Sequence, residues 1–282
     1  MTTAITADST CDISTALYKR YDVTMISLYI NLGDKAYKDG LDISTKELFQ
    51  YVDRTGELPK TAAPSPEDYR AVFGRLVGEG KEVVHISLSS EMSASYSNAC
   101  RAAKEFENVR VIDSRSLSTG SGLLVVKAAE FAALGLASGE VASRVLALIP
   151  QVEASFVIDT LTYLHKGGRC SSVAALGANL LHLKPCIEVR DGRMQVSKKY
   201  RGALKRCLND YIKDRLADRA DIDPSRAFIT HTVQDAALLE HTKKAVQDAF
   251  PFAEVLITDA GGTISSHCGP GTMGVLFLRK EA

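Results

Sequence analysis

The chain has 282 residues, of which 45% are hydrophobic, and its 34 basic residues balance 34 acidic ones. This composition allows a sizeable folded core. A formal net charge of zero removes the broad attraction that draws proteins to nucleic acids, and no apolar run approaches the ~20 residues of a membrane span, so we expect no nucleic-acid partner and no stable membrane insertion.

In the first half of the chain, short β-rich runs alternate with amphipathic segments. The predicted strands are Ala4–Ala7, Val23–Ile30, Val83–Leu88 and Val109–Ile112. Two helix starts are marked between them: Ser44 with Glu47 matches a capping box, and Ser65-Pro66 followed by two acids gives an N-cap and an N1 proline. This alternation predicts a mainly parallel sheet covered by helices.

A long helical stretch from about Gly120 to Ile149 leads to a second series of elements. In chain order we predict strand Ser155–Asp159, helix Ser172–His182, a hairpin at Asp191-Gly192, helix Gly202–Leu216, strand Ala227–Thr230, helix Asp235–Ala249, strand Glu254–Thr258 and strand Met273–Leu278. We place the boundary near Pro150. The sequence thus predicts two α/β lobes, residues 1–150 and 151–282.

The cysteines and histidines give no sign of a metal site. The six cysteines lie far apart without a C-x-x-C pair, and the histidines lack H-E-x-x-H or similar spacing. The segment Met1–Ile13 lacks the basic and apolar regions of a signal peptide. We therefore expect a cytoplasmic protein with reduced thiols and no metal.

Polar clusters stand where predicted strands end, at residues 8–10, 61–65 and 87–93. In open α/β sheets, ligands bind beyond the carboxyl ends of the strands, and hydroxyl groups gathered there suit an anionic head group. Serine, threonine and aspartate at such places also commonly cap helices or close turns. Each cluster alone therefore fits either role.

Two further segments combine glycine with basic residues. Residues 166–169 read Lys-Gly-Gly-Arg, which fits a carboxylate or phosphate site as well as a tight turn, and residues 265–271 form a glycine-proline loop carrying His267. Neither P-loop spacing nor a G-x-G-x-x-G after a strand is present, so nucleotide binding has no support. A serine hydrolase with Ser93 and His267 is conceivable, although Ser93 does not lie in a G-x-S-x-G elbow.

Taken together, these segments resemble the DegV family of bacterial fatty-acid-binding proteins, including the FakB class, the fatty-acid-carrying subunits of fatty acid kinase. The resemblance rests on five segments in order: Asp8–Asp12, Thr61–Ser65, Ile86–Ala99, Leu161–Arg169 and His267–Gly271. It implies one DegV-like unit over about residues 3–280, with two α/β lobes, the acyl chain enclosed in one lobe and its carboxylate near the cleft.

The resemblance also implies a fatty-acid site, with no catalytic residue and no cofactor. Its carboxylate contacts fall on Thr61 and Ser93, with the backbone at Ala94 close by, and Arg169 and His267 lie beside them. This chain departs from the family's usual residues at four positions: Ala62, Ala94, Cys170 and Cys268. The expected ligand is a long-chain fatty acid such as palmitate, stearate or oleate.

The leading hypothesis is therefore a non-enzymatic carrier that presents the carboxylate to a separate fatty acid kinase. Burying about fourteen methylenes offers gross transfer energy of order 11 kcal/mol, provided that the carboxylate is hydrogen-bonded. The alternatives are an enzyme acting on acyl or phosphate substrates through Ser93 and His267, and a regulatory protein that senses fatty acid.

Overall fold

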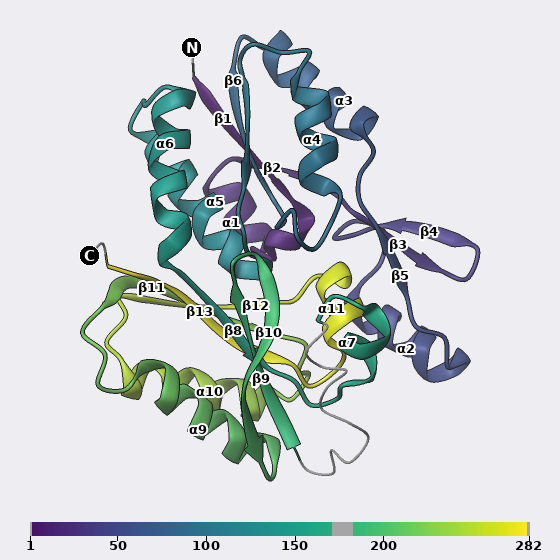
Figure 1. The fold of residues 1–282 in the computed structure, drawn as a ribbon, viewed down its shortest axis with the longest axis vertical. Helices are drawn as coiled ribbons and strands as arrows, with labels where there is room; N and C mark the ends of the chain where they lie inside the picture. The colour runs from purple at the N-terminus through teal and green to yellow at the C-terminus, as the bar shows by residue number, and fades with distance from the viewer. Residues whose placement is uncertain (1, 171–182, 281–282) are drawn as a thin grey trace.

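The computed structural model describes residues 2–170 and 183–280, and three β-sheets lie within these ranges (Figure 1). The first sheet has the order β2 (Val23–Ile26), β1 (Thr3–Asp8), β6 (Glu82–Ser87), β7 (Val109–Asp113). The second has the order β10 (Arg193–Arg201), β9 (Leu183–Arg190), β8 (Val152–Val157), β13 (Met273–Arg279), β11 (Ile222–His231), β12 (Glu254–Asp259). The third has the order β4 (Lys35–Lys38), β3 (Tyr29–Leu32), β5 (Lys60–Ala62).

The helices among the described residues cover these sheets. They are α1 (Thr15–Arg20), α2 (Thr45–Thr55), α3 (Pro66–Gly78), α4 (Ser95–Ala103), α5 (Ser118–Ala133), α6 (Ser138–Leu148), α7 (Thr162–Gly167), α9 (Leu204–Leu216), α10 (Ala236–Ala249) and α11 (Gly262–Cys268), with short 3₁₀ turns η1 (Ser9–Cys11) and η2 (Ile149–Gln151). No helix in the described part of the chain is long and apolar enough to cross a membrane.

The first sheet is parallel throughout, as the sequence predicts. Helices α3 and α4 cover one face and α5 and α6 cover the other (Figure 1). Alternation along the strands explains this: Val83 packs with α3 and α4, whereas Val84 and Ile86 pack with α5. The capping boxes at Ser44 and Ser65 both form, so α2 and α3 begin where predicted.

The predicted strand Val23–Ile30 is wrong, because the run is divided between two sheets. Strand β2 ends at Ile26, and β3 begins at Tyr29 in the third sheet. Between them the Leu28 backbone N–H donates to the Ser9 hydroxyl at 3.1 Å instead of to a neighbouring strand. The chain therefore leaves the first sheet here and carries β3 and β5 toward the second lobe.

Helix α5 lies between the first and second sheets and belongs to the core of both. The same hydrophobic cluster contains Ile5 of the first sheet, Leu124 of α5 and Leu276 of the second sheet. The predicted long helical stretch is two helices, because the chain breaks at Gly135, whose φ of 79° is left-handed. The boundary near Pro150 stays a prediction.

The second sheet is mixed, with β13 at its centre between β8 and β11. Helices α9 and α10 cover the face away from α5. The hairpin joining β9 to β10 turns at Asp191 (φ 50°) and Gly192 (φ 78°), as the Asp-Gly pair predicts for a type I′ turn. Strand β8 begins three residues before the predicted strand at Ser155, and the predicted helix Ser172–His182 lies outside the described residues.

Candidate functional site

Loops from both lobes enclose a pocket of about 190 Å³, called here the loop pocket. It is lined by Leu28, Thr61, Ala62, Ala63, Leu88, Met92, Ser93, Ala94, Leu117, Arg169, Met194, Thr263, Ile264, His267 and Cys268. All five predicted site residues, Thr61, Ser93, Ala94, Arg169 and His267, are among them. The structure thus brings together residues that lie up to 206 positions apart in the chain.

Each of these residues is placed by the end of an element. Thr61 lies in the edge strand β5, and Ser93 and Ala94 lie in the loop between β6 and α4. Arg169 follows Gly168, the residue that caps the C-terminal end of α7. His267 lies in the last turn of α11, which ends at Cys268. The prediction of a loop over residues 265–271 is therefore wrong for residues 265–268, and only the residues from Gly269 onward lie outside the helix.

Thr61 and His267 contact each other directly across the pocket. The Thr61 hydroxyl lies 2.9 Å from His267 Nε2, and the buried Nδ1 has no hydrogen-bond partner among the described residues. Burial lowers the pKa of His267 to about 4, with a smaller contribution from the positive charge of Arg169. The imidazole is therefore neutral near pH 7.

The glycine pair lets this histidine approach the turn after α7. A Cβ atom at Gly167 would lie 2.5 Å from His267 Nδ1, so a larger residue would displace the ring. Gly168 ends α7 with a left-handed φ of 66°, and the Arg169 guanidinium then folds back to donate to the Gly167 carbonyl at 2.7 Å. The turn therefore exists, and it places the exposed Arg169 at the pocket.

Ser93 lies one residue before the N-cap of α4. Its hydroxyl oxygen accepts a hydrogen bond from the Ser95 backbone N–H at 3.1 Å and lies 2.9 Å from the Ser95 hydroxyl. This local arrangement holds the Ser93 hydroxyl in the pocket lining at the start of a helix, where the backbone favours anions.

The polar cluster at residues 8–10 does not line the pocket but holds the loops that do. The Asp8 carboxylate accepts hydrogen bonds from the Ser87 hydroxyl at 2.7 Å and the Leu88 N–H at 2.8 Å, at the start of the loop that carries Ser93. It also accepts from Tyr69 of α3 at 2.7 Å. Burial opposes ionisation, but hydrogen bonds and the nearby His85 outweigh it and lower the pKa of Asp8.

The inner wall of the pocket is apolar, and sequence reasoning did not assign its residues. Leu28, Leu88, Leu117 and Ile264 belong to a buried cluster that continues into the second lobe at Phe156. These residues come from separate segments, so no local pattern marks them. Thr263 was also missed; its buried hydroxyl has no hydrogen-bond partner among the described residues, and a Gly-Gly-Thr sequence at the start of α11 is the only signal for it.

Comparisons with known proteins agree on one family. The family model described as "Uncharacterised protein, DegV family" matches residues 2–280. A DegV domain-containing protein from Caldanaerobacter subterraneus is 34% identical over 281 residues, covering 98% of this chain and 99% of the relative.

Solved structures show the same fold. A fatty-acid-binding DegV family protein from Thermus thermophilus is similar with a TM-score of 0.89 and 29% identity, covering 99% of this chain and 100% of that one. A stearic-acid-binding protein from Eubacterium ventriosum is similar with a TM-score of 0.85 and 28% identity, covering 98% of each chain. With its parallel first sheet and mixed second sheet, this chain has the α/β DegV fold and belongs to the DegV family.

Proposed function

We propose that this protein binds one long-chain fatty acid, with the carboxylate at Thr61, Ser93 and His267 in the loop pocket, and presents it to a separate fatty acid kinase. The observation that carries the proposal is the pocket lining, which combines these polar groups with a buried apolar wall. The Thermus thermophilus relative, described as fatty-acid-binding, supports the same ligand class.

A carboxylate suits this polar end. The Thr61 and Ser93 hydroxyls can donate hydrogen bonds to an ionised group, and Arg169 adds a positive charge at the exposed side. The carboxylate would also favour the protonated form of His267, because it brings a negative charge beside an imidazole that is otherwise neutral. Fatty acid binding should therefore raise the pKa of His267.

The acyl tail needs more room than the loop pocket contains. Its volume of about 190 Å³ is below the ~300 Å³ at which small-molecule pockets begin, so it suits the head group and the start of the chain. Beyond it lies the apolar cluster around Phe156 and Ile158. Met92 and Met194 line the pocket at this junction, and their flexible side chains can move aside for a tail.

Presentation to a kinase requires that the head group be reachable. Ala62, Ala94 and Arg169 are exposed, whereas the apolar lining is mostly buried. A carboxylate at this end would therefore lie near solvent while the tail is enclosed. The proposal assigns no chemical step to this chain, and the phosphoryl group comes from the partner.

The contacts favour a carrier over an enzyme using Ser93 and His267. Nucleophilic catalysis by serine requires a hydrogen bond to its base. Here the Ser93 hydroxyl interacts with Ser95 and His267 interacts with Thr61. The serine and the histidine thus each interact with another residue and not with each other.

Lipid analysis of protein purified from bacterial cells tests the proposal. We expect about one fatty acid per chain, and raised melting temperature when palmitate or oleate is added to lipid-free protein. The double variant Thr61→Ala/Ser93→Ala should bind at least about a hundredfold more weakly. A matched control is Ser143→Ala, which removes an exposed hydroxyl of α6 that donates to the Gly139 carbonyl of the same helix, away from the pocket lining.

The outcomes separate the hypotheses. No recovered lipid together with no thermal stabilisation would contradict fatty acid binding altogether. Binding without phosphorylation of the bound lipid by any kinase of the source cell would remove the presentation role and leave a sensor of fatty acid.

A further inference from the structure

A second, larger cavity of about 560 Å³ lies where strands β8 and β9 separate. Residues Ser155–Val157 of β8 pair with Cys186–Glu188 of β9. The two strands do not pair beyond Ser155 and Glu188, although β8 begins at Val152 and β9 continues to Arg190. The residues beyond the last pair line the opening on both sides. The opening therefore results from the way in which β8 and β9 diverge. It does not share a single lining residue with the loop pocket.

Arginine dominates the lining of this opening, called here the arginine cleft. Five arginines converge on it from different elements: Arg115 after β7, Arg190 at the end of β9, Arg215 of α9, Arg219 after α9 and Arg279 at the end of β13. The acidic residues of the lining are Glu153, Glu188 and Asp191. The described lining thus has two positive charges more than negative ones, although Glu91 and Asp221, just outside it, pair with Arg115 at 3.3 Å and Arg219 at 2.6 Å.

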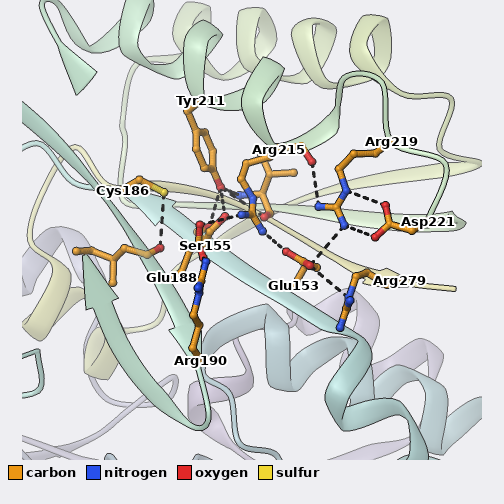
Figure 2. Close-up of polar contacts among 12 residues, drawn as sticks. Glu153, Ser155, Cys186, Glu188, Arg190, Tyr211, Arg215, Arg219, Asp221 and Arg279 are labelled. Atoms are coloured by element: carbon orange, nitrogen blue, oxygen red, sulfur yellow. Dashed lines mark hydrogen bonds and ion pairs between the residues drawn. The ribbon is translucent and has the colours of Figure 1, made fainter. Parts of the chain in front are cut away.

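The two glutamates are shared among several arginines (Figure 2). Glu153 pairs with Arg215, with Arg219 at 3.5 Å and with Arg279 at 3.3 Å. Glu188 pairs with Arg190 at 2.6 Å and with Arg215 at 2.9 Å. Asp221, outside the lining, pairs with Arg219 at 2.6 Å, and the Pro150 carbonyl accepts a hydrogen bond from Arg279 at 2.7 Å. Each guanidinium carries five N–H donors, so these four arginines still have more donors than these acceptors can use.

Unused donors remain in the buried part of the cleft. The Arg215 side chain is 14% exposed, yet its Nε has no hydrogen-bond partner among the described residues. Arg279 Nε lies 3.3 Å from Glu153 without the geometry of a hydrogen bond. An ion-pair network that only fastens α9 to the sheet would need partners for its buried donors and a filled interior, and neither condition holds here.

The remaining lining indicates the kind of anion that fits. Guanidinium groups match phosphate oxygens through paired hydrogen bonds. Ile149, Pro150, Val152 and Val189 add an apolar wall. The volume lies within the range of roughly 300 to 1,000 Å³ typical of small-molecule sites and is larger than a lone phosphate needs. We propose that the arginine cleft between β8 and β9 binds a phosphorylated small molecule.

Calorimetric titration of the full chain tests this proposal with three probes: ADP, inorganic phosphate, and vesicles containing phosphatidylglycerol. We expect saturable ADP binding that phosphate competes with and that weakens as salt is raised. The double variant Arg190→Gln/Arg279→Gln removes two of the five positive charges, and its Kd for ADP should rise about tenfold or more. Both side chains are partly exposed, at 63% and 43%, and each glutamate keeps another arginine, so the variant should fold.

A matched control is Arg144→Gln on α6, where an arginine that is 49% exposed pairs with Glu140 outside the cleft. This change should leave the Kd for ADP within about twofold. Vesicle binding that ADP displaces and the double variant loses would identify a lipid head group as the source of the phosphate, in support of the proposal. The proposal is overturned if no probe binds saturably, if the double variant binds ADP like the parent, or if vesicles bind without competition from ADP.

Discussion

The loop pocket and the arginine cleft would each bind an anion, but the side chains that line them differ in charge and polarity. The loop pocket of about 190 Å³ uses neutral hydroxyls, a neutral histidine and one exposed arginine against an apolar wall. The cleft of about 560 Å³ uses five permanent charges that are partly balanced by carboxylates. A carboxylate with a long tail gains its affinity from apolar burial, whereas a phosphate without one depends on charge. The residues that line each site, more than the charge of the ligand, should therefore determine how its ligand affinity depends on salt, pH and mutation.

The largest effect should come from the centre of the cleft. Arg215→Met removes the guanidinium that joins Glu153 to Glu188 and leaves two partly buried carboxylates with fewer partners. We expect the free energy of unfolding to fall by about 3 to 5 kcal/mol. Urea unfolding of lipid-free protein measures this, with Arg144→Gln as a control that should change stability by under about 1 kcal/mol. An equally small change for Arg215→Met would show that the cleft contributes charge but not stability.

A pH dependence should distinguish the loop pocket. The folded-state pKa of His267 is about 4, below the ~6.5 of an unfolded histidine, so the contribution to stability is complete above pH 6.5 and is lost as the pH falls toward 4. The full difference is about 3 kcal/mol. Melting curves of lipid-free parent and His267→Asn between pH 7 and 4.5 should converge as the pH falls. Parallel curves would contradict the lowered pKa.

The arginine cleft should not share this dependence. Arginine stays charged throughout the range, and although burial opposes ionisation of Glu188, Arg190 and Arg215 outweigh it and lower the pKa of that carboxyl. The ion pair between Arg215 and Glu188 should therefore be less sensitive to pH than His267 over this window.

Smaller effects should follow from single hydroxyls of the loop pocket. Thr61→Ala or Ser93→Ala each removes one donor to a charged group, worth about 1.5 to 3 kcal/mol, so fatty acid affinity should fall by roughly ten- to a hundredfold. Competition binding with a fluorescent fatty acid measures this beside the melting temperature. Because the hydrogen bonds are short-ranged and the tail is apolar, raising salt should change the affinity little. If fatty acid affinity fell steeply with salt, the loop pocket would depend on charge in the same way as the cleft, and the contrast between the two sites would be wrong.

The smallest effect concerns the contact that links the two sites. The Ser89 hydroxyl, in the loop that carries Ser93, donates to the carbonyl of Gly192, which lines the cleft, at 2.7 Å. Ser89→Ala should lower the free energy of unfolding by about 1 kcal/mol and leave fatty acid affinity nearly unchanged. Ser90→Ala, an exposed neighbour bonded to Asp113, is the control for affinity. A tenfold loss of fatty acid affinity in Ser89→Ala alone would show that the sites are coupled.

The elements that could be predicted from the sequence are those marked by short-range patterns. Apolar runs predicted β1, β6 and β7, and the capping residues Ser44 and Ser65 predicted α2 and α3, because these patterns depend on neighbours within one or two turns. It missed the short polar strand β5, which exists because β3 pairs with it. It also missed the helix that carries His267.

The two sites differ in the same way. Thr61, Ser93, Ala94, Arg169 and His267 could be named because family resemblance marks them, and the structure places them around one pocket. The cleft arginines have no such signal, since they are spread from position 115 to position 279 and meet only when α9 and the separated strands are in place. Long-range convergence of this kind is a property of topology.

Because β13 lies at the centre of the second sheet, this sheet cannot be completed until the end of the chain has been synthesised. Strand β8 ends at Val157, but β13, one of the two strands that pair with it, begins only at Met273, about 116 residues later. At ~5 to 20 residues per second, roughly 6 to 23 s of synthesis separate them. The first sheet, by contrast, has all four strands by Asp113. During this interval β8 presents an unpaired edge in the future middle of the sheet, so association between nascent chains should begin in the second lobe.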